Sequence, residues 1–286
     1  MAEKRGLGVA GYQRPARLNE ALAALTAAPR VIVAGGTDFY PTRVGRPLDD
    51  DILDITNLAE LRRLREEGDA WRIPALATWT EIIEARLPPY FRGLQLAARE
   101  VGGVQIQNAG TVCGNLCNAS PAADGVPGLL ALDAEVELAS AGGARRLKLS
   151  EFITGNRKTA RRPDELMTAI LVPKLRRAAR ATFQKLGARK YLVISIVMVG
   201  AVVEIDNGNV AAARVAVGAC SAVAQRLRLL ERELVGKKLD ERLADVVAER
   251  HLAPLKPIDD VRGTADYRND AAVTLLRRAL ADLVVA

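Results

Sequence analysis

The middle of the chain contains a long segment, residues 105–127, that shows little helix or strand periodicity. Small and polar residues are spread through it, and apolar residues do not recur at the spacing of either element. Loops of this length without secondary structure of their own are uncommon in compact domains, and they are often functional. We therefore expect one long functional loop here, with the regular elements arranged around it.

A shorter glycine-rich stretch lies nearer the N-terminus. The β-branched run Val31–Val33 predicts a strand, and Ala34-Gly35-Gly36-Thr37-Asp38 follows it directly. A strand that ends in a glycine turn and polar residues can open backbone amides towards a phosphate. A tight turn without a ligand is an equally good interpretation. The stretch is not a dinucleotide fingerprint, because the third glycine of that motif is missing.

The second part of the long segment, residues 110–124, combines neutral hydrogen-bonding side chains with glycines. Thr111, Asn115, Asn118 and Ser120 could contact a pyrophosphate or a sugar alcohol, and Asp124 could accept hydrogen bonds from ribose hydroxyls. A solvated loop is the alternative interpretation.

The N-terminal two thirds of the chain divide into two predicted units. A helix at 18–28 and strands at 31–33 and 51–55 predict a small α/β unit over residues 1–57. Residues 58–177 are more mixed and are expected to form an α+β unit. Its predicted elements are a helix capped by Thr80, a helix at 91–101 and an alternating strand at 134–138.

Residues 178–286 have a different pattern. A β-rich run at 194–205, a turn at Asp206-Asn207-Gly208-Asn209 and a second run at 210–217 predict an antiparallel hairpin. Helical patterns follow, and these are at 227–234, 241–250 and 271–285. We expect an antiparallel sheet with a helix bundle.

Composition excludes several classes of protein. With one histidine (His251) and three cysteines (Cys113, Cys117, Cys220), the chain cannot hold a four-thiolate iron–sulfur cluster. We expect no metal site, a buried structural Cys220, and His251 on the surface or in a C-terminal helical turn. The net charge of +7 is spread along the chain and aromatic residues make up only 4%, which argues against nucleic-acid binding.

Targeting signals are also not apparent in the sequence. No charge-free apolar stretch reaches the roughly 18 residues that a spanning helix needs, and residues 1–8 contain no apolar signal region. We therefore expect no membrane span and a cytoplasmic protein.

Taken together, the motifs resemble one family over nearly the whole chain. The matching stretches are 34–38, 105–115, 118–124, 164–173, 183–189 and 257–268. They resemble the FAD-binding medium subunit of molybdenum hydroxylases, of the xanthine dehydrogenase and carbon monoxide dehydrogenase flavoprotein type. The resemblance implies an α+β fold: a two-subdomain FAD-binding domain of the PCMH/VAO type, then a C-terminal antiparallel sheet with a helix bundle.

The resemblance also implies a cofactor site. FAD would lie between the first two units, with residues 32–38 and 111–115 around the pyrophosphate and Asp124 at the sugar hydroxyls. Met167 (or Leu166) would pack against the adenine or the ring side, and Lys185, in a loop at 184–191, would lie near the isoalloxazine. The implied cofactor-binding residues are Ile32, Val33, Ala34, Gly35, Gly36, Thr37, Asp38, Val101, Thr111, Val112, Cys113, Gly114, Asn115, Asp124, Met167 and Lys185. Tyr191 either shields the ring or is an ordinary tyrosine, and no residue of this chain is expected to act as a catalytic acid or base.

By the same resemblance, the chain is one subunit of a larger enzyme. A large molybdopterin subunit would hydroxylate the substrate, and a small subunit with [2Fe-2S] clusters would pass electrons to FAD here, in a dimer of heterotrimers. The electron acceptor (NAD, oxygen, a quinone or another) and the substrate are left open. A stand-alone flavoenzyme is disfavoured, because the C-terminal half also matches the hydroxylase subunit.

Two residues depart from the family pattern. Cys113 stands where the family usually has glycine, and Gln107 stands where it often has arginine. In a left-handed backbone conformation, a non-glycine residue at 113 would cost roughly 1–2 kcal/mol. The alternative hypothesis is therefore a scaffold subunit of the same kind of complex that has lost its flavin through Cys113.

Overall fold

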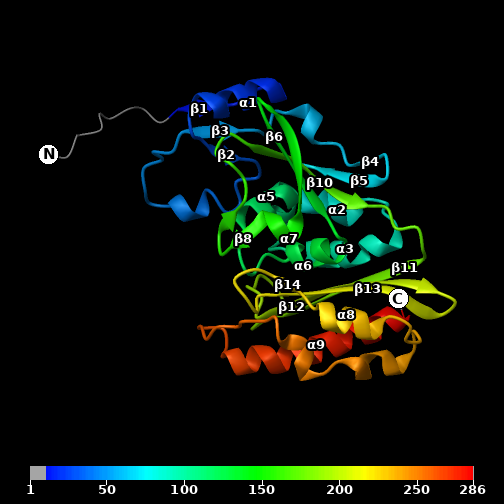
Figure 1. Ribbon diagram of the computed structural model, residues 1–286. Coiled ribbons are helices and arrows are strands. Elements are labelled where there is room, and N and C mark those ends of the chain that lie inside the picture. Colours follow the sequence, from blue (N-terminus) through cyan, green and yellow to red (C-terminus); the bar gives the residue numbers. More distant parts are fainter. Residues whose placement is uncertain (1–10, 286) are drawn as a thin grey trace.

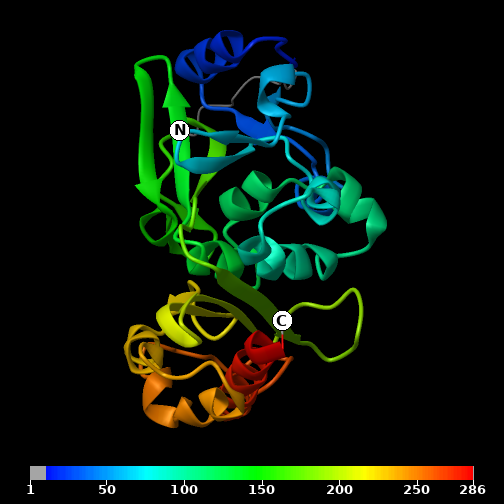
Figure 2. The same cartoon turned by 90° about the vertical axis from the view of Figure 1, so that its right-hand side faces the viewer.

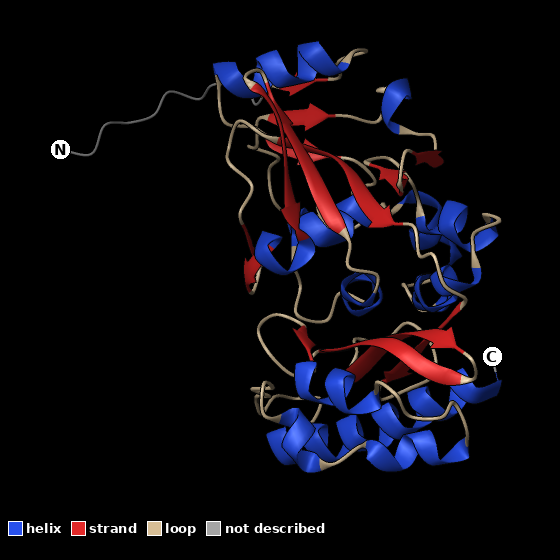
Figure 3. Cartoon of the chain, turned by 45° about the vertical axis from the view of Figure 1, so that its right-hand side comes forward, coloured by secondary structure: helices blue, strands red, loops and turns tan. Residues whose placement is uncertain are grey.

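The computed structural model describes residues 11–285, in which sheets and helices are stacked in layers (Figure 3). The two largest sheets have five and four strands. The N-terminal elements lie at one end and the C-terminal sheet and helices at the other, with a helical layer between the two main sheets (Figure 1). The expectation about a signal region concerns residues outside the described range, as does the start of the first predicted unit.

The first unit is a three-stranded parallel sheet with one helix. Its strand order is β1 (Tyr12–Gln13), β3 (Ile52–Asp54), β2 (Val31–Val33), and α1 (Leu18–Ala27) connects the first and second strands in sequence. The helix packs through buried Ala21 and Leu25 into a core shared with the sheet. The helix and both strands predicted here are confirmed.

The second unit contains a five-stranded antiparallel sheet. Its order is β4 (Arg65–Glu67), β5 (Ala70–Pro74), β10 (Leu166–Pro173), β6 (Glu135–Ser140) and β7 (Gly143–Lys148). The helices of this unit lie mainly below it: α2 (Trp79–Glu84), α3 (Arg92–Arg99) and α7 (Leu149–Phe152), with a small ribbon of β8 (Ile153–Gly155) and β9 (Lys158–Thr159). The central strand β10 is buried at every position except its last. It has a neighbouring strand on each side, β5 and β6, and both of its faces are covered.

The segment 105–127 is not one long loop, and that expectation was wrong. It contains most of α4 (Val104–Ala109), all of α5 (Val112–Asn118) and the start of α6 (Gly125–Ala131). Each helix is too short for a periodic pattern to be visible. In addition, every residue of α6 is buried, and a helix covered on all sides has no polar face to alternate with an apolar one.

The C-terminal unit is a four-stranded antiparallel sheet. The order is β11 (Ala179–Leu186), β12 (Val197–Asp206), β13 (Asn209–Gly218) and β14 (Gln225–Arg226). The predicted turn at 206–209 joins β12 and β13, which confirms the hairpin. One face is covered by α8 (Arg228–Leu234) and α9 (Ala265–Val285), and the other by α3 and α6.

One local expectation for the C-terminal unit was wrong, and a second is confirmed in one of its two alternatives. The single helical pattern at 241–250 forms two 3-10 turns, Glu241–Val246 and Glu249–Leu252. His251 is not on the surface but lies in the last turn of the second of these. It is fully buried: its Nδ1 accepts a hydrogen bond from the N–H of Ala248, and its Nε2 lies 3.1 Å from a carboxylate oxygen of Glu233. Cys220 is buried as expected.

The helical layer packs directly on the C-terminal sheet. A Cβ added at Gly200 on β12 would lie 2.7 Å from the backbone nitrogen of Gly128 on α6, so only glycine allows this approach. In the side view, the β11–β12 connection projects from this sheet as a yellow-green loop (Figure 2). The sheet therefore supports the middle layer from below.

Candidate functional site

The two glycine-rich stretches meet in space although about seventy residues separate them in the sequence. A Cβ added at Gly35 would lie 1.8 Å from the carbonyl oxygen of Ala109. A Cβ added at Gly110 would lie 3.3 Å from Thr37 Oγ1. The two loops are thus in backbone contact, and a side chain at position 35 would force them apart.

The backbone at the start of α2 holds the second glycine-rich stretch, residues 110–112, in place. Val112 N–H donates to the carbonyl of Ala77 at 3.0 Å, and Trp79 N–H donates to the carbonyl of Gly110 at 3.2 Å. Thr78, rather than the expected Thr80, caps α2 through a capping box with Glu81. Trp79 was not predicted as part of the site, because its only signal in the sequence is a lone aromatic residue after a capping threonine.

Backbone donors are available at the first loop. Gly36 adopts a left-handed conformation with φ +68°, which is one element of the backbone nests that bind anions. No acceptor within residues 11–285 pairs with the N–H groups of Gly35, Gly36, Thr37 or Asp38. Such a group of free amides is suited to an anion such as a phosphate.

An unpaired acceptor lies at the second loop. Asn115 Oδ1 is buried and has no hydrogen-bond partner within the described residues. It lies 3.1 Å from the position of a Cβ added at Gly125, and the ring of Trp79 lies 2.5 Å from that position. Because buried polar groups are normally paired, this oxygen is suited to a ligand hydroxyl or N–H group. Unpaired amides at the first glycine-rich stretch and an unpaired acceptor in the second fit a nucleotide that carries both phosphate and hydroxyl groups.

Cys113 does not occupy the left-handed conformation considered above. It is the second residue of α5, is 3% exposed and packs into the core beneath β5, with Sγ 3.9 Å from the carbonyl oxygen of Ile73. Burial raises the pKa of its thiol well above the usual range. The thiol therefore lies in the core and adds no backbone strain.

Asp124 and Lys185 form a second polar cluster. Lys185 is on β11, so its expected position in a loop was wrong. Its Nζ donates to Asp124 Oδ2 at 2.8 Å and to the carbonyl of Glu100 at 3.2 Å, while Ser195 Oγ donates to Asp124 Oδ1 at 2.7 Å. Burial raises the pKa of Asp124, and the nearby Lys185 charge opposes this effect. Ser195 was not predicted as part of the site, because the sequence around it contains no local signal.

The remaining predicted residues lie on several different elements. Ile32 and Val33 are on β2, and Thr111 caps α5 by accepting a hydrogen bond from Gly114 N–H at 3.0 Å. Val101 follows Glu100 beside the Asp124 cluster. Met167 is buried on β10, with its sulfur 4.0 Å from Cys117 Sγ at the far end of α5. Tyr191 is 67% exposed on the β11–β12 connection.

Two family models match consecutive parts of the chain. The model described as "FAD binding domain in molybdopterin dehydrogenase" matches residues 7–175, and "CO dehydrogenase flavoprotein C-terminal domain" matches residues 181–283. The chain belongs to the family of FAD-binding medium subunits of molybdenum hydroxylases. It is a subunit of the xanthine dehydrogenase and CO dehydrogenase type of oxidoreductase.

Curated relatives agree with this family. The chain is 30% identical over 283 residues to the putative xanthine dehydrogenase FAD-binding subunit of Escherichia coli (strain K12), with 97% of both chains covered. It is 38% identical over 189 residues to the nicotinate dehydrogenase FAD-subunit of Eubacterium barkeri, which covers 64% of this chain and 63% of that relative. It is 30% identical to the carbon monoxide dehydrogenase medium chain of Afipia carboxidovorans, with 94% of both covered.

Solved structures have the same fold. A chain of the reconstituted CO dehydrogenase from Oligotropha carboxidovorans superposes with a TM-score of 0.86 at 28% identity, covering 97% of this chain and 98% of that one. A chain of quinoline 2-oxidoreductase from Pseudomonas putida 86 gives 0.87 at 25% identity, with 97% of both covered. The fold is therefore an α+β FAD-binding domain followed by the family's C-terminal sheet and helices. In the part of the chain that the structure describes, no helix is long and apolar enough to cross a membrane.

Proposed function

We propose that the chain binds one FAD at the junction of the two glycine-rich loops and passes electrons through it to an external acceptor. The observation that carries this proposal is the backbone contact between Gly35 and Ala109. It brings the unpaired amides of residues 35–38 to the start of the stretch that contains Asn115, whose Oδ1 has no partner within the described residues. FAD would supply the redox chemistry, and the chain would bind it, orient it and set its electrostatic surroundings.

The residues around the cofactor are part of the proposal. Residues 32–38 and 111–115 would hold the pyrophosphate, with Asn115 accepting a hydrogen bond from the ligand. Asp124 would contact sugar hydroxyls while it stays paired with Lys185 and Ser195. Val101 and Met167 complete the predicted set.

The proposed electron donor is a small partner subunit with [2Fe-2S] clusters, and the proposed site of hydroxylation is a large molybdopterin subunit. This assembly is supported by relatives that are themselves medium chains or FAD subunits of such enzymes. A dimer of heterotrimers in the cytoplasm belongs to the same proposal, as does the division into units 1–57, 58–177 and 178–286.

The test is purification of the complex through a tag on this chain. We expect two further subunits, with molybdenum, iron and FAD in stoichiometric amounts, and loss of the visible flavin absorbance on anaerobic reduction. A folded chain that purifies colourless and takes up no added FAD would contradict the proposal.

A further inference from the structure

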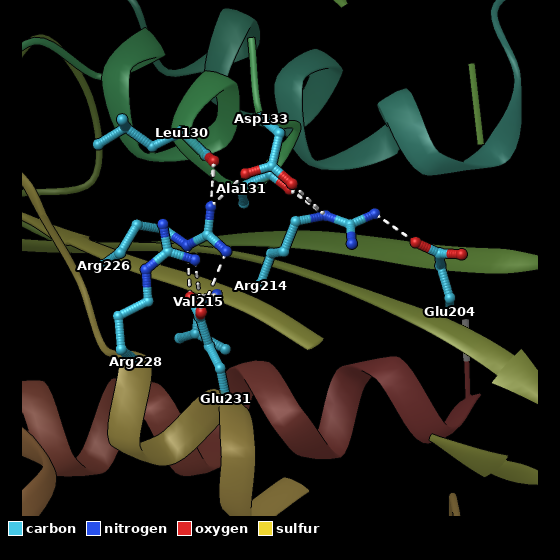
Figure 4. Close-up of polar contacts among 9 residues, drawn as sticks. All are labelled: Leu130, Ala131, Asp133, Glu204, Arg214, Val215, Arg226, Arg228 and Glu231. Carbon is cyan, nitrogen blue, oxygen red and sulfur yellow. Dashed lines mark hydrogen bonds and ion pairs between the residues drawn. The ribbon is translucent and has the colours of Figure 1, made fainter. Parts of the chain in front are cut away.

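The C-terminal end of α6 is held by an arginine clamp, which we define as Arg214 and Arg226 together with Asp133 (Figure 4). Arg226 Nη1 donates to the carbonyl of Leu130 at 2.8 Å and to Asp133 Oδ1 at 2.7 Å. Arg214 Nε donates to the carbonyl of Ala131 at 3.1 Å and lies 3.3 Å from Asp133 Oδ2. Both arginines come from the C-terminal sheet, whereas α6 belongs to the FAD-binding domain.

The clamp adds hydrogen bonds at the end of the helix, where the carbonyl of Leu130 also accepts from the N–H of Asp133 at 3.1 Å. The last carbonyls of a helix have no partner within the helix, and cations near that end are favoured by the helix dipole. Asp133, which follows α6 closely, has a left-handed backbone with φ +50°, so the chain turns sharply where the arginines bind. The two guanidinium groups therefore fix both the end of the helix and the turn after it.

The arginines are themselves held from the opposite side. Arg226 pairs with Glu231, whose Oε1 also accepts from the backbone N–H of Val215 at 2.9 Å. Arg214 Nη2 donates to Glu204 at 2.6 Å. The side chains of Arg214 and Arg226 are only 11% and 8% exposed. Removing one member of such a buried network leaves the charges of its partners buried and unpaired, which is destabilising.

The N-terminal end of α6 contacts the proposed flavin site. Asp124 directly precedes the helix, and Gly125, its first residue, packs against Trp79 and Asn115. The seven residues of α6 span about 10 Å, so the helix reaches from the clamp to the unpaired oxygen of Asn115. Because α6 is buried throughout, a shift at one end displaces the other.

We propose that Arg214 and Arg226 are positioning residues for the flavin site, acting through α6 on Asn115 and Asp124. The inference rests on the proposed function, because it concerns the same site. It assigns to the C-terminal domain a second, indirect part in shaping that site, in addition to the contacts of Lys185 and Ser195 with Asp124.

The test compares Arg226→Gln and Arg214→Gln with a matched control, Arg228→Gln. Arg228 also contacts Glu231, at 3.1 Å, but its side chain is 62% exposed and makes no hydrogen bond to α6. Each full-length variant is titrated with FAD, and the reduction potential of bound flavin is measured at saturating FAD. We expect Arg226→Gln and Arg214→Gln to bind FAD about tenfold more weakly and to shift the potential. Arg228→Gln should stay within about twofold of the parent chain.

Two milder variants cover the case in which a glutamine variant does not fold. Arg226→Lys keeps the charge and should recover part of the lost affinity, and Asp133→Asn, at a half-exposed position, should weaken FAD binding in the same direction. Folded clamp variants that match the parent chain in FAD affinity and potential overturn the inference alone. A folded parent chain that binds no FAD overturns the proposed function instead.

Discussion

Gly35 and Gly110 provide the contact between the two loops of the site. A Cβ at Gly35 would meet the backbone of Ala109, and a Cβ at Gly110 would meet the carbonyl oxygen of Ile106 at 2.9 Å. Cys113 stands where the family usually has glycine, but its side chain packs into the core, away from that contact. At the scale of residues, the site is therefore sensitive to position 35 and tolerant at position 113.

For Gly35→Ala, we expect FAD affinity to fall by at least about tenfold, because the added Cβ meets the carbonyl of Ala109 and separates the loops. The loss of stability should be about 1–3 kcal/mol. FAD titration and urea unfolding measure the two effects. Gly142→Ala is the control, since the nearest atom to its Cβ is 3.7 Å away. Wild-type affinity in Gly35→Ala would contradict the proposed site.

For Cys113→Gly, we expect unchanged flavin occupancy and a loss of stability of about 1–2 kcal/mol, from helix propensity and a small cavity. Cys113→Ala should show a smaller loss, because alanine restores the helix propensity. Flavin content of the purified protein and thermal unfolding check this. A sharp rise in occupancy in Cys113→Gly would support the flavin-free scaffold instead.

Among the elements, the five-stranded sheet contains a largely buried ion pair. Arg72 on β5 donates to Glu137 on β6 at 2.5 Å, and Thr168 on the strand between them donates to the same carboxylate at 2.8 Å. The hydrogen bond from Arg72 is the main cause that lowers the pKa of Glu137 from 4.5 to about 2. The ion pair thus joins β5 and β6 across the intervening strand β10.

This lowered pKa predicts an acid sensitivity. The carboxylate stabilises the fold fully above pH 4.5, and that contribution is lost as the pH falls through about 2. Glu137→Gln should be less stable than the parent chain at neutral pH and should lose less stability on acidification. Urea unfolding over this pH range measures both, with Glu135→Gln on the same strand as the control. If the free energy of unfolding changes equally with pH in Glu137→Gln and in the parent chain, this role is ruled out.

The elements also show how far the sequence was informative. The run Val31–Val33 followed by two glycines predicts a strand and turn from local chemistry alone, and the turn at 206–209 predicts the β12–β13 hairpin in the same way. The motif resemblance predicted the family and the α+β fold. What brings Gly35 against Ala109 is tertiary packing, so the contact itself has no local signature.

The features that the sequence did not predict have physical reasons. The helices within 105–127 are short, and α6 is buried all round, so no periodic pattern marks it. Lys185 and Asp124 are 61 residues apart, and nothing local indicates that they pair. His251 is buried because Glu233 and the Ala248 amide supply partners for both ring nitrogens.

For the whole molecule, the FAD-binding domain and the C-terminal sheet are tied along the full length of α6. Lys185 and Ser195 hold its N-terminal side, Gly200 allows close approach at its middle, and the clamp holds its end. The stacked layers should therefore unfold as one cooperative unit.

For Gly200→Ala, we expect this cooperativity to weaken, because the added Cβ would lie 2.7 Å from the backbone of α6. The cost should be about 1–3 kcal/mol. Calorimetry should show one transition for the parent chain and a broadened or split transition for the variant. Gly155→Ala, whose Cβ meets only a lysine side chain at 3.7 Å, is the control. A single unshifted transition in Gly200→Ala would show that this contact does not couple the two parts.

FAD binding by this chain is tested by titrating the purified full-length protein with FAD, followed by calorimetry or by flavin fluorescence. We expect saturable binding of one FAD per chain, with binding strongly weakened by Gly35→Ala and unchanged by Cys113→Gly. A folded parent chain that shows no saturable binding, or one whose affinity is the same in Gly35→Ala, would contradict it.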